Sequence, residues 1–203
     1  KFKRTMTNKL LFFVLLALCF SGCDMLETHP YDVHITGERE LTNKNIQLIE
    51  NKMQGKKTIR FAMISDTQRW YNSTEDVVKA LNARGDIDFV IHGGDQSDFG
   101  VTKEFIWMRD IFNKFQMPYV CLLGNHDCLG TGEDAYRAIY GDPNFAFTAG
   151  NVRFICLNTN AMEYDYSEPV PDFNFIENEL NNLSPEIEKT VFAMHVKPFE
   201  FVF

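Results

Sequence analysis

Four apolar stretches of this sequence each run directly into side chains that can bind a metal ion. The clearest is Phe89-Val90-Ile91-His92, which is followed by two glycines and then by two acids three residues apart, Asp95 and Asp98. Glycine lets the backbone turn sharply where a strand ends. In chain order, the four stretches deliver Asp66 with Gln68, Asp95 with Asp98, Asn125 with His126, and His195.

These carboxylate, amide and imidazole groups predict metal-assisted hydrolysis. Carboxylates and imidazoles suit Zn, Mn or Fe, and one aspartate can bridge two such ions through its two oxygens. Two ions about 3.5–4 Å apart supply a bridging hydroxide and stabilise the attacking and leaving oxygens of a phosphoryl group. Each of Asp66, Asp95 and Asp127 could instead cap a helix, but their joint spacing favours a metal site. A metal-dependent amidohydrolase would need the same ligand types in another order.

The elements that must position these residues are predicted to be neighbouring strands of one sheet. Strands over residues 58–64, 89–92 and 118–123 alternate with two helices, one from a capping box at Ser73-Thr74-Glu75-Asp76 to Gly85 and one over 102–115. This order predicts parallel strands joined by right-handed crossovers. Because the carboxyl ends of parallel strands share one edge of the sheet, we expect Asp66, Asp95 and Asn125 to lie together.

The remaining segments predict a second sheet and further helices. Two short strands flank Ala149-Gly150-Asn151, a pattern typical of a β-hairpin, and a strand over 190–194 delivers His195. Amphipathic helices are predicted over 42–53, 133–140 and 173–183. With 203 residues and 45% hydrophobic content, the chain can bury one sizeable core.

The first 23 residues have the features of an export signal. A basic lead, formed by the four residues Lys1, Lys3, Arg4 and Lys9, precedes an apolar run over 10–20. The run ends in Phe20-Ser21-Gly22-Cys23. The run is shorter than the about 20 residues that span a bilayer and fits the apolar region of a secretory signal. The ending resembles the lipobox of bacterial lipoproteins, in which Cys23 becomes lipid-modified, although Phe20 departs from it. The alternative is a signal anchor with an incidental cysteine.

We therefore expect a signal peptide over 1–22, a tether with a short helix over 23–57, and a domain over 58–203, lipid-anchored in a bacterial cell envelope. Removal of the four basic residues of the lead changes the formal charge from −8 to about −12. So negative a chain would be repelled by the phosphates of a nucleic-acid backbone, which argues against that partner. The cysteines of the domain, Cys121, Cys128 and Cys156, are predicted to be free thiols.

The order of the motifs resembles that of the calcineurin-like metallophosphoesterases. The resemblance rests on Asp66-Thr67-Gln68, Gly94-Asp95-Gln96-Ser97-Asp98, Gly124-Asn125-His126-Asp127 and the isolated His195. It covers roughly residues 58–195, and the second and third blocks together are highly specific. It implies an α/β sandwich of two sheets flanked by helices, two transition-metal ions, and hydrolysis of phosphomonoesters or phosphodiesters.

The resemblance also implies a role for each residue. Asp66 and Gln68 would ligate the first metal, Asp95 would bridge both metals, and Asn125 and His195 would ligate the second. His126 would contact the scissile phosphate and assist the leaving group, with Asp98 orienting it by a hydrogen bond. Outside the motifs, Arg69 and Asn158 are candidate substrate-binding residues, on the loop of the first block and at the end of the hairpin.

Two departures from the family pattern carry expectations of their own. Gln68 stands where the family usually has histidine, so the first metal should bind less tightly, although some branches of the family also have glutamine. The family's glycine-His-x-His segment has no counterpart after His195, so each metal would lose one ligand. These departures predict a C-terminally incomplete domain whose second sheet lacks an edge. The alternative is a non-catalytic, truncated envelope lipoprotein with an incomplete metal site.

Overall fold

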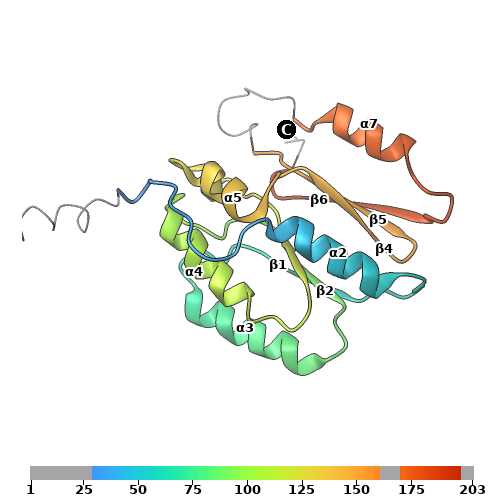
Figure 1. Ribbon diagram of the computed structural model, residues 1–203, viewed down its shortest axis with the longest axis horizontal. Helices are drawn as coiled ribbons and strands as arrows, with labels where there is room; N and C mark the ends of the chain where they lie inside the picture. The colour runs from blue at the N-terminus through green and yellow to red at the C-terminus, as the bar shows by residue number, and fades with distance from the viewer. Residues whose placement is uncertain (1–28, 161–169, 198–203) are drawn as a thin grey trace, which may run out of the picture.

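The computed structural model describes residues 29–160 and 170–197, which form two three-stranded sheets with helices outside them (Figure 1). The first sheet has the order β1 (Phe61–Ile64), β2 (Phe89–His92), β3 (Tyr119–Cys121), all parallel. The second contains the antiparallel hairpin β4 (Phe145–Ala149) and β5 (Val152–Leu157), with β6 (Lys189–Met194) parallel to β5. The predicted parallel sheet, the hairpin and the two-sheet architecture are confirmed.

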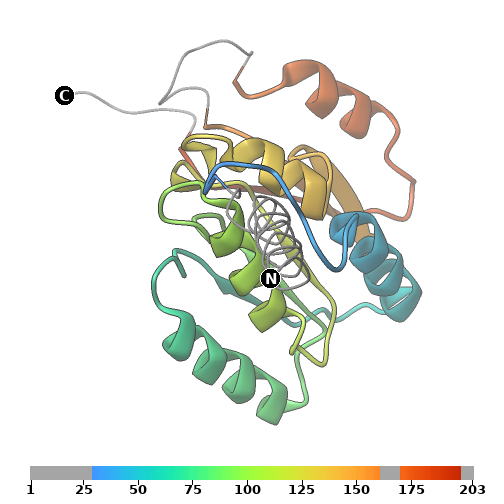
Figure 2. The same cartoon turned by 60° about the vertical axis from the view of Figure 1, so that its left-hand side comes forward.

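Helices lie outside both sheets. The crossover helices α3 (Tyr71–Arg84) and α4 (Thr102–Phe112) lie on one side, and α7 (Phe173–Asn181) lies beyond the second sheet (Figures 1 and 2). The short 3₁₀ turn η2 (His126–Cys128) and α5 (Gly132–Tyr140) follow β3, while α2 (Leu41–Met53) packs along β3 and β4. In the described part of the chain, no helix has both the length and the apolar character needed to cross a membrane.

The continuous apolar run of β2 is explained by burial on both faces. Side chains alternate between the two faces of a strand. Phe89 therefore points into the space between the sheets, where its ring centroid lies 5.6 Å from that of Phe147 and 5.5 Å from that of Phe154. Val90 points to the opposite face and belongs to the core under the helices. A strand buried on both sides needs apolar residues at every position.

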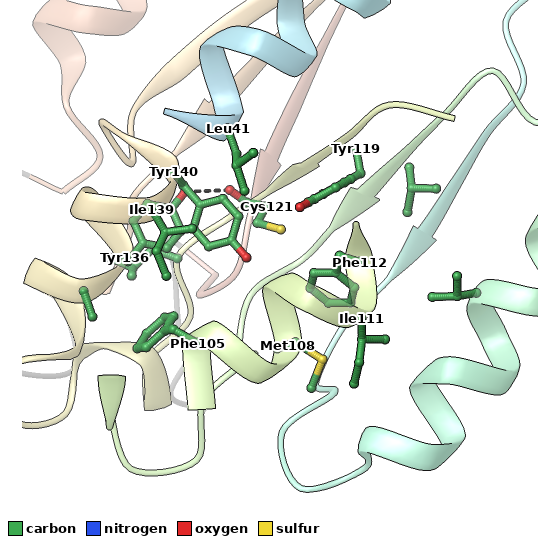
Figure 3. Close-up of a cluster of buried hydrophobic side chains, with 14 of the residues drawn as sticks. Leu41, Phe105, Met108, Ile111, Phe112, Tyr119, Cys121, Tyr136, Ile139 and Tyr140 are labelled. Carbon is green, nitrogen blue, oxygen red and sulfur yellow. Dashed lines mark hydrogen bonds between the residues drawn. The ribbon is translucent and has the colours of Figure 1, made fainter. Parts of the chain in front are cut away.

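The core between the first sheet and the helices combines aliphatic and aromatic side chains (Figure 3). Phe105, Met108 and Phe112 recur at helical spacing on α4 and are fully buried, as predicted for the helix face on the sheet. Tyr136 of α5 is also buried, and its hydroxyl donates to the backbone carbonyl of Cys121 at 2.6 Å. This bond satisfies a polar group that would otherwise be costly to bury.

Three predicted helix boundaries are wrong by two or more residues, and one of them is the end of the helix predicted over 173–183, which lies at Asn181. The first crossover helix begins at Tyr71, not at the Ser73 capping box, and the Thr74 hydroxyl donates to the Trp70 carbonyl inside the first turn. A side chain that bonds back to the preceding turn does not cap a helix start. The second crossover helix ends at Phe112, not at Phe115. The Phe115 ring still stacks on that of Phe112, with the ring centroids 6.0 Å apart. Phe115 therefore packs with the apolar face of the helix although its own backbone is not helical.

The segment over 29–40 is fastened to α4 through Arg109. The guanidinium of Arg109 is buried and donates to the carbonyls of Thr36 and Glu38. Ile35 adds a buried apolar contact. The three cysteines of the described residues are free thiols, as predicted.

Candidate metal centre

The loops after β1 and β2 are held together by their backbones. The N–H of Asp66 donates to the carbonyl of Gly94, and the N–H of Gln68 donates to that of Asp95, both at 3.1 Å. Asp66 and Asp95 adopt positive φ values of 57° and 60°, which are uncommon for residues other than glycine. Such strained conformations persist only where the surroundings enforce them, and they gather at functional sites.

Glycines allow the three strand ends to approach closely. A Cβ atom on Gly94 would lie 2.7 Å from Nδ1 of His195 and 2.8 Å from the Cα of Gly124. A Cβ atom on Gly124 would collide with the backbone nitrogen and Oδ1 of Asp95. Any larger residue would push the loops apart, so the glycine positions set the size of the site.

Four of the predicted metal ligands converge at this edge of the sheet. Asp66, Asp95 and His195 each offer one ligand atom, and these atoms lie within 4.8 Å of one another. Nε2 of His195 also lies 2.9 Å from Oδ1 of Asn125 and 3.5 Å from Oδ1 of Asp95. β6 brings His195 here from the second sheet, so both sheets contribute to the cluster.

The fifth predicted ligand, Gln68, has the environment expected of a metal-binding amide. Its Oε1 atom is buried and has no hydrogen-bond partner among the described residues. A buried oxygen without a donor costs about 1–3 kcal/mol, and a cation would remove that cost. Carboxylate, amide and imidazole donors are also a ligand mixture that transition metals accept. The residues present therefore fit a metal centre.

The electrostatics of the cluster centre on Asp95 and His195. The hydrogen bond to Asp95 raises the pKa of His195 to about 9, against the opposing effect of burial. Burial also disfavours the charge of Asp95, but hydrogen bonds from His195 and from the backbone N–H of His126 keep the pKa of Asp95 below its usual value. Both ring nitrogens of His195 face oxygen acceptors, the Gly93 carbonyl and Asn125. Metal binding must displace the proton on Nε2.

His126 lies beside the ligands and is tied to them through its backbone. Its N–H donates to Oδ1 of Asp95 at 2.9 Å, and its Nδ1 lies 3.0 Å from the carbonyl oxygen of Asp98. A carbonyl only accepts hydrogen bonds, so Nδ1 carries a proton and Nε2 is the basic nitrogen of the neutral ring. Asp98 therefore contacts His126 as expected, but through its main chain.

The Asp98 carboxylate pairs with Arg69. Oδ1 of Asp98 lies 2.7 Å from the Arg69 guanidinium and 3.7 Å from Nδ1 of His126. The Asp98 side chain is only 4% exposed, whereas that of Arg69 is 65% exposed. The pair leaves most of the guanidinium open at the rim of the site.

The candidate substrate-binding residue Asn158 forms hydrogen bonds with residues outside this cluster. Oδ1 of Asn158 accepts hydrogen bonds from the backbone and side chain of Asn160, whose Nδ2 donates to the carbonyl of Leu123. Asn158 thus joins the end of β5 to the segment after β3, which is a structural contact. Cys23 lies outside the described residues.

Asp127 supports the site, although the sequence analysis assigned it no role of its own. Its carboxylate is fully buried and accepts four backbone N–H groups at 2.8–3.0 Å. The donors belong to Asp95, Gln96, Ser97 and Gly124, so one side chain joins two ligand-bearing loops. Burial raises the pKa of Asp127 to about 7, although the N–H groups of Ser97, Gly124 and Asp95 act in the opposite direction. In the sequence, the feature that could have indicated this role is the position of Asp127, an acid directly after His126.

His92 supports the site from within β2. Its Nε2 lies 2.9 Å from the Thr67 hydroxyl, and its Nδ1 accepts the N–H of Gly94. Burial lowers the pKa of His92 to about 3, so the ring is neutral and fixes the loops after both β1 and β2.

This chain matches known proteins in sequence and in fold. The family model described as calcineurin-like phosphoesterase matches residues 59–200. A 3′,5′-cyclic-nucleotide phosphodiesterase of Nostoc sp. is 27% identical over 124 residues, which cover 60% of this chain and 46% of the relative. The chain thus spans about half the length of this curated relative.

A solved structure of purple acid phosphatase from yellow lupin (Lupinus luteus) seeds shares the fold. It superposes with a TM-score of 0.52 at 17% identity, over 68% of this chain and 30% of that chain. At this identity the likeness concerns the fold alone.

Proposed function

This chain belongs to the calcineurin-like phosphoesterase family, and on that basis we propose that it hydrolyses phosphomonoesters or phosphodiesters with two bound transition-metal ions. The observation that carries the proposal is the convergence of Asp66, Asp95 and His195, whose ligand atoms lie within 4.8 Å of one another. The unpartnered Oε1 of Gln68 supports it, because a buried oxygen of this kind calls for a cation.

The ligands divide between two ions around Asp95. Asp66 and Gln68 would hold the first ion, Asn125 and His195 the second, and Asp95 would serve both through its two oxygens. Mn, Fe and Zn all accept such donors. When bound, the ions supply Lewis-acid activation of the phosphoryl group and a water acidic enough to attack it near neutral pH.

His126 is suited to protonate the leaving group. Its Nδ1–H is held by the carbonyl of Asp98, so proton exchange takes place at Nε2. A side chain that gives its proton to the departing oxygen contributes about 10²–10⁴-fold to the rate. Arg69 would bind a phosphoryl oxygen with the N–H groups that its pair with Asp98 leaves open, because a guanidinium carries five donors.

The test combines metal content with hydrolysis. The chain is purified without chelators, its metals are counted by elemental analysis, and bis(p-nitrophenyl) phosphate and p-nitrophenyl phosphate are supplied with Mn, Fe or Zn. The phosphodiesterase relative and the phosphatase neighbour are the reason for offering both a diester and a monoester. We expect about two metal ions per chain and metal-dependent hydrolysis.

Asp95→Asn is the decisive variant, because it keeps an oxygen for the His126 N–H but removes the charge that serves both ions. We expect the variant to lose metal and about 10²–10³-fold in rate, the usual cost of removing one electrostatic group from an active site. Asp76→Asn makes the same change on an exposed residue that pairs with Lys79, and it should keep both properties. A folded wild-type chain with neither metal nor activity would instead support the non-catalytic lipoprotein.

We also propose that Cys23 is lipidated and anchors the chain in a bacterial cell envelope. The proposal is supported by the basic lead, the apolar run over 10–20 and Ser21-Gly22 before the cysteine. Expressed in bacteria with tritiated palmitate, the chain should be labelled, whereas Cys23→Ser should not and Cys128→Ser should. Equal labelling of Cys23→Ser would refute the anchor.

A further inference from the structure

The loop that follows β2 is wrapped around a single carboxylate, that of Glu104 in the first turn of α4. One oxygen, Oε2, lies within hydrogen-bonding distance of four donors. They are the Ser97 hydroxyl at 2.8 Å and the backbone N–H groups of Asp98 at 3.2 Å, Phe99 at 3.0 Å and Val101 at 3.3 Å. The Ser97 hydroxyl oxygen also accepts the N–H of Gly100 at 2.7 Å. The whole loop from 97 to 101 is therefore closed around Glu104.

Helix capping explains only part of this arrangement. A glutamate at the third position of a helix commonly accepts the N–H of the residue before the helix, which here is Val101. That contact is the longest of the four. The other three donors belong to residues 97–99, which precede the cap. The Glu104 carboxylate thus accepts more hydrogen bonds from the loop before the helix than from the residue that caps the helix.

The loop held by Glu104 in turn holds His126. The Asp98 N–H is bound by Glu104, and the Asp98 carbonyl lies 3.0 Å from Nδ1 of His126. The backbone N–H and the backbone carbonyl of Asp98 therefore connect Glu104 with the imidazole of His126. Hydrogen bonds weaken steeply as their geometry departs from the optimum, so a displaced Asp98 would release the ring from its orientation.

We propose that Glu104 is a positioning residue that acts through Asp98 to aim Nε2 of His126 at the leaving oxygen. The inference rests on the proposed function. In the step concerned, the ring is the imidazolium, with a proton on each nitrogen. The oxygen of the attacking water bonds to phosphorus and loses a proton to solvent, the bond from phosphorus to the leaving oxygen breaks, and Nε2 gives its proton to that oxygen, which leaves the neutral ring with its proton on Nδ1. Glu104 touches none of the reacting atoms.

The test compares a poor leaving group with a good one. Phenolate from phenyl phosphate needs protonation as it departs, whereas p-nitrophenolate departs readily without it. In Glu104→Gln, we expect kcat for phenyl phosphate to fall about tenfold more than kcat for p-nitrophenyl phosphate, a part of the full effect of a general acid, while KM changes little. A merely structural role would lower both rates equally, and that result would overturn the proposal.

Two further variants control for stability. Asp172→Ala removes the cap of α7, where the carboxylate accepts the N–H of Phe175. It should lower stability, as lost caps do, and leave the ratio of the two rates unchanged. Ser97→Ala removes one donor of the loop and leaves Glu104 in place as the helix cap. It should shift the ratio in the same direction as Glu104→Gln, and it decides the question if Glu104→Gln does not fold.

A measurement without substrate separates this inference from the proposed function. Nitrogen-15 NMR of labelled histidine reports which ring nitrogen of His126 is protonated. We expect Nδ1–H in the wild-type chain and a mixture of tautomers in Glu104→Gln. If the wild-type chain hydrolyses neither these monoesters nor bis(p-nitrophenyl) phosphate, the proposed function fails. An unchanged tautomer in Glu104→Gln would overturn the positioning role by itself.

Discussion

Replacing Asp127 by asparagine should disconnect the two loops that carry Asp95 and Asn125. Each oxygen of the Asp127 carboxylate accepts two backbone N–H groups, Oδ1 from Gln96 and Ser97 and Oδ2 from Asp95 and Gly124. Asparagine has nearly the same shape but only one oxygen. Whichever way its amide is turned, the NH₂ group faces two N–H donors.

The expected cost follows from those two lost acceptors. A buried donor left without a partner costs about 1–3 kcal/mol, so Asp127→Asn should lower the free energy of unfolding by about 2–6 kcal/mol. Metal affinity should also fall, by about 10–100-fold, as it does when groups that orient metal ligands are removed. The reason is that the displaced N–H groups belong to the loops that carry the ligands.

Urea denaturation at pH 8 measures the first effect, and metal titration of the folded variant measures the second. At this pH the carboxyl group, whose pKa burial raises to about 7, is ionised in the folded protein. Asp134→Asn is the control, because Asp134 is exposed on α5 and such surface changes stay within about 0.5 kcal/mol. A loss for Asp127→Asn no larger than that of the control would refute the reasoning and would mean that the native carboxyl group is neutral.

Two further predictions concern His92 and Gly124. Burial lowers the pKa of His92 to about 3, below the value of about 6.5 in unfolded chains. As the pH falls from 6.5 towards 3, His92 should therefore reduce the free energy of unfolding by up to about 1.4 kcal/mol per pH unit. Urea denaturation at several pH values should show a shallower acid dependence for His92→Asn, and an equal slope would contradict the assignment. Gly124→Ala should abolish metal binding in elemental analysis, because a Cβ atom there collides with Asp95, whereas Gly55→Ala, with nothing within 4 Å, should keep it. A metal-loaded Gly124→Ala would show that the loops can separate without loss of the site.

Much of the fold follows from local sequence patterns. The apolar runs of β1, β2 and β3 and the helical spacing on α4 predict a parallel sheet covered by helices, and the structure confirms both. Helix boundaries were predicted less well. α3 begins at Tyr71 because helical backbone can start before the capping residues that a sequence offers, and the Thr74 hydroxyl bonds to the turn behind it.

The sequence by itself determined which residues are candidate metal ligands and where on the sheet they meet. Asp66, Asp95 and Asn125 each follow an apolar strand, and strands joined by helical crossovers run parallel, so their carboxyl ends must lie on one edge of the sheet. Each step of that inference uses hydrophobic periodicity within a short window of the chain.

Only the tertiary structure decided what holds the ligands in place. Asp127 binds a loop about thirty residues earlier in the chain, and Glu104 binds the loop whose Asp98 carbonyl contacts His126. Oε1 of Gln68 has no hydrogen-bond partner in the described part of the chain. These facts depend on how closely separate loops approach one another. A polar side chain takes whichever donor or acceptor the folded chain brings within about 3 Å, and periodicity carries no information about that choice.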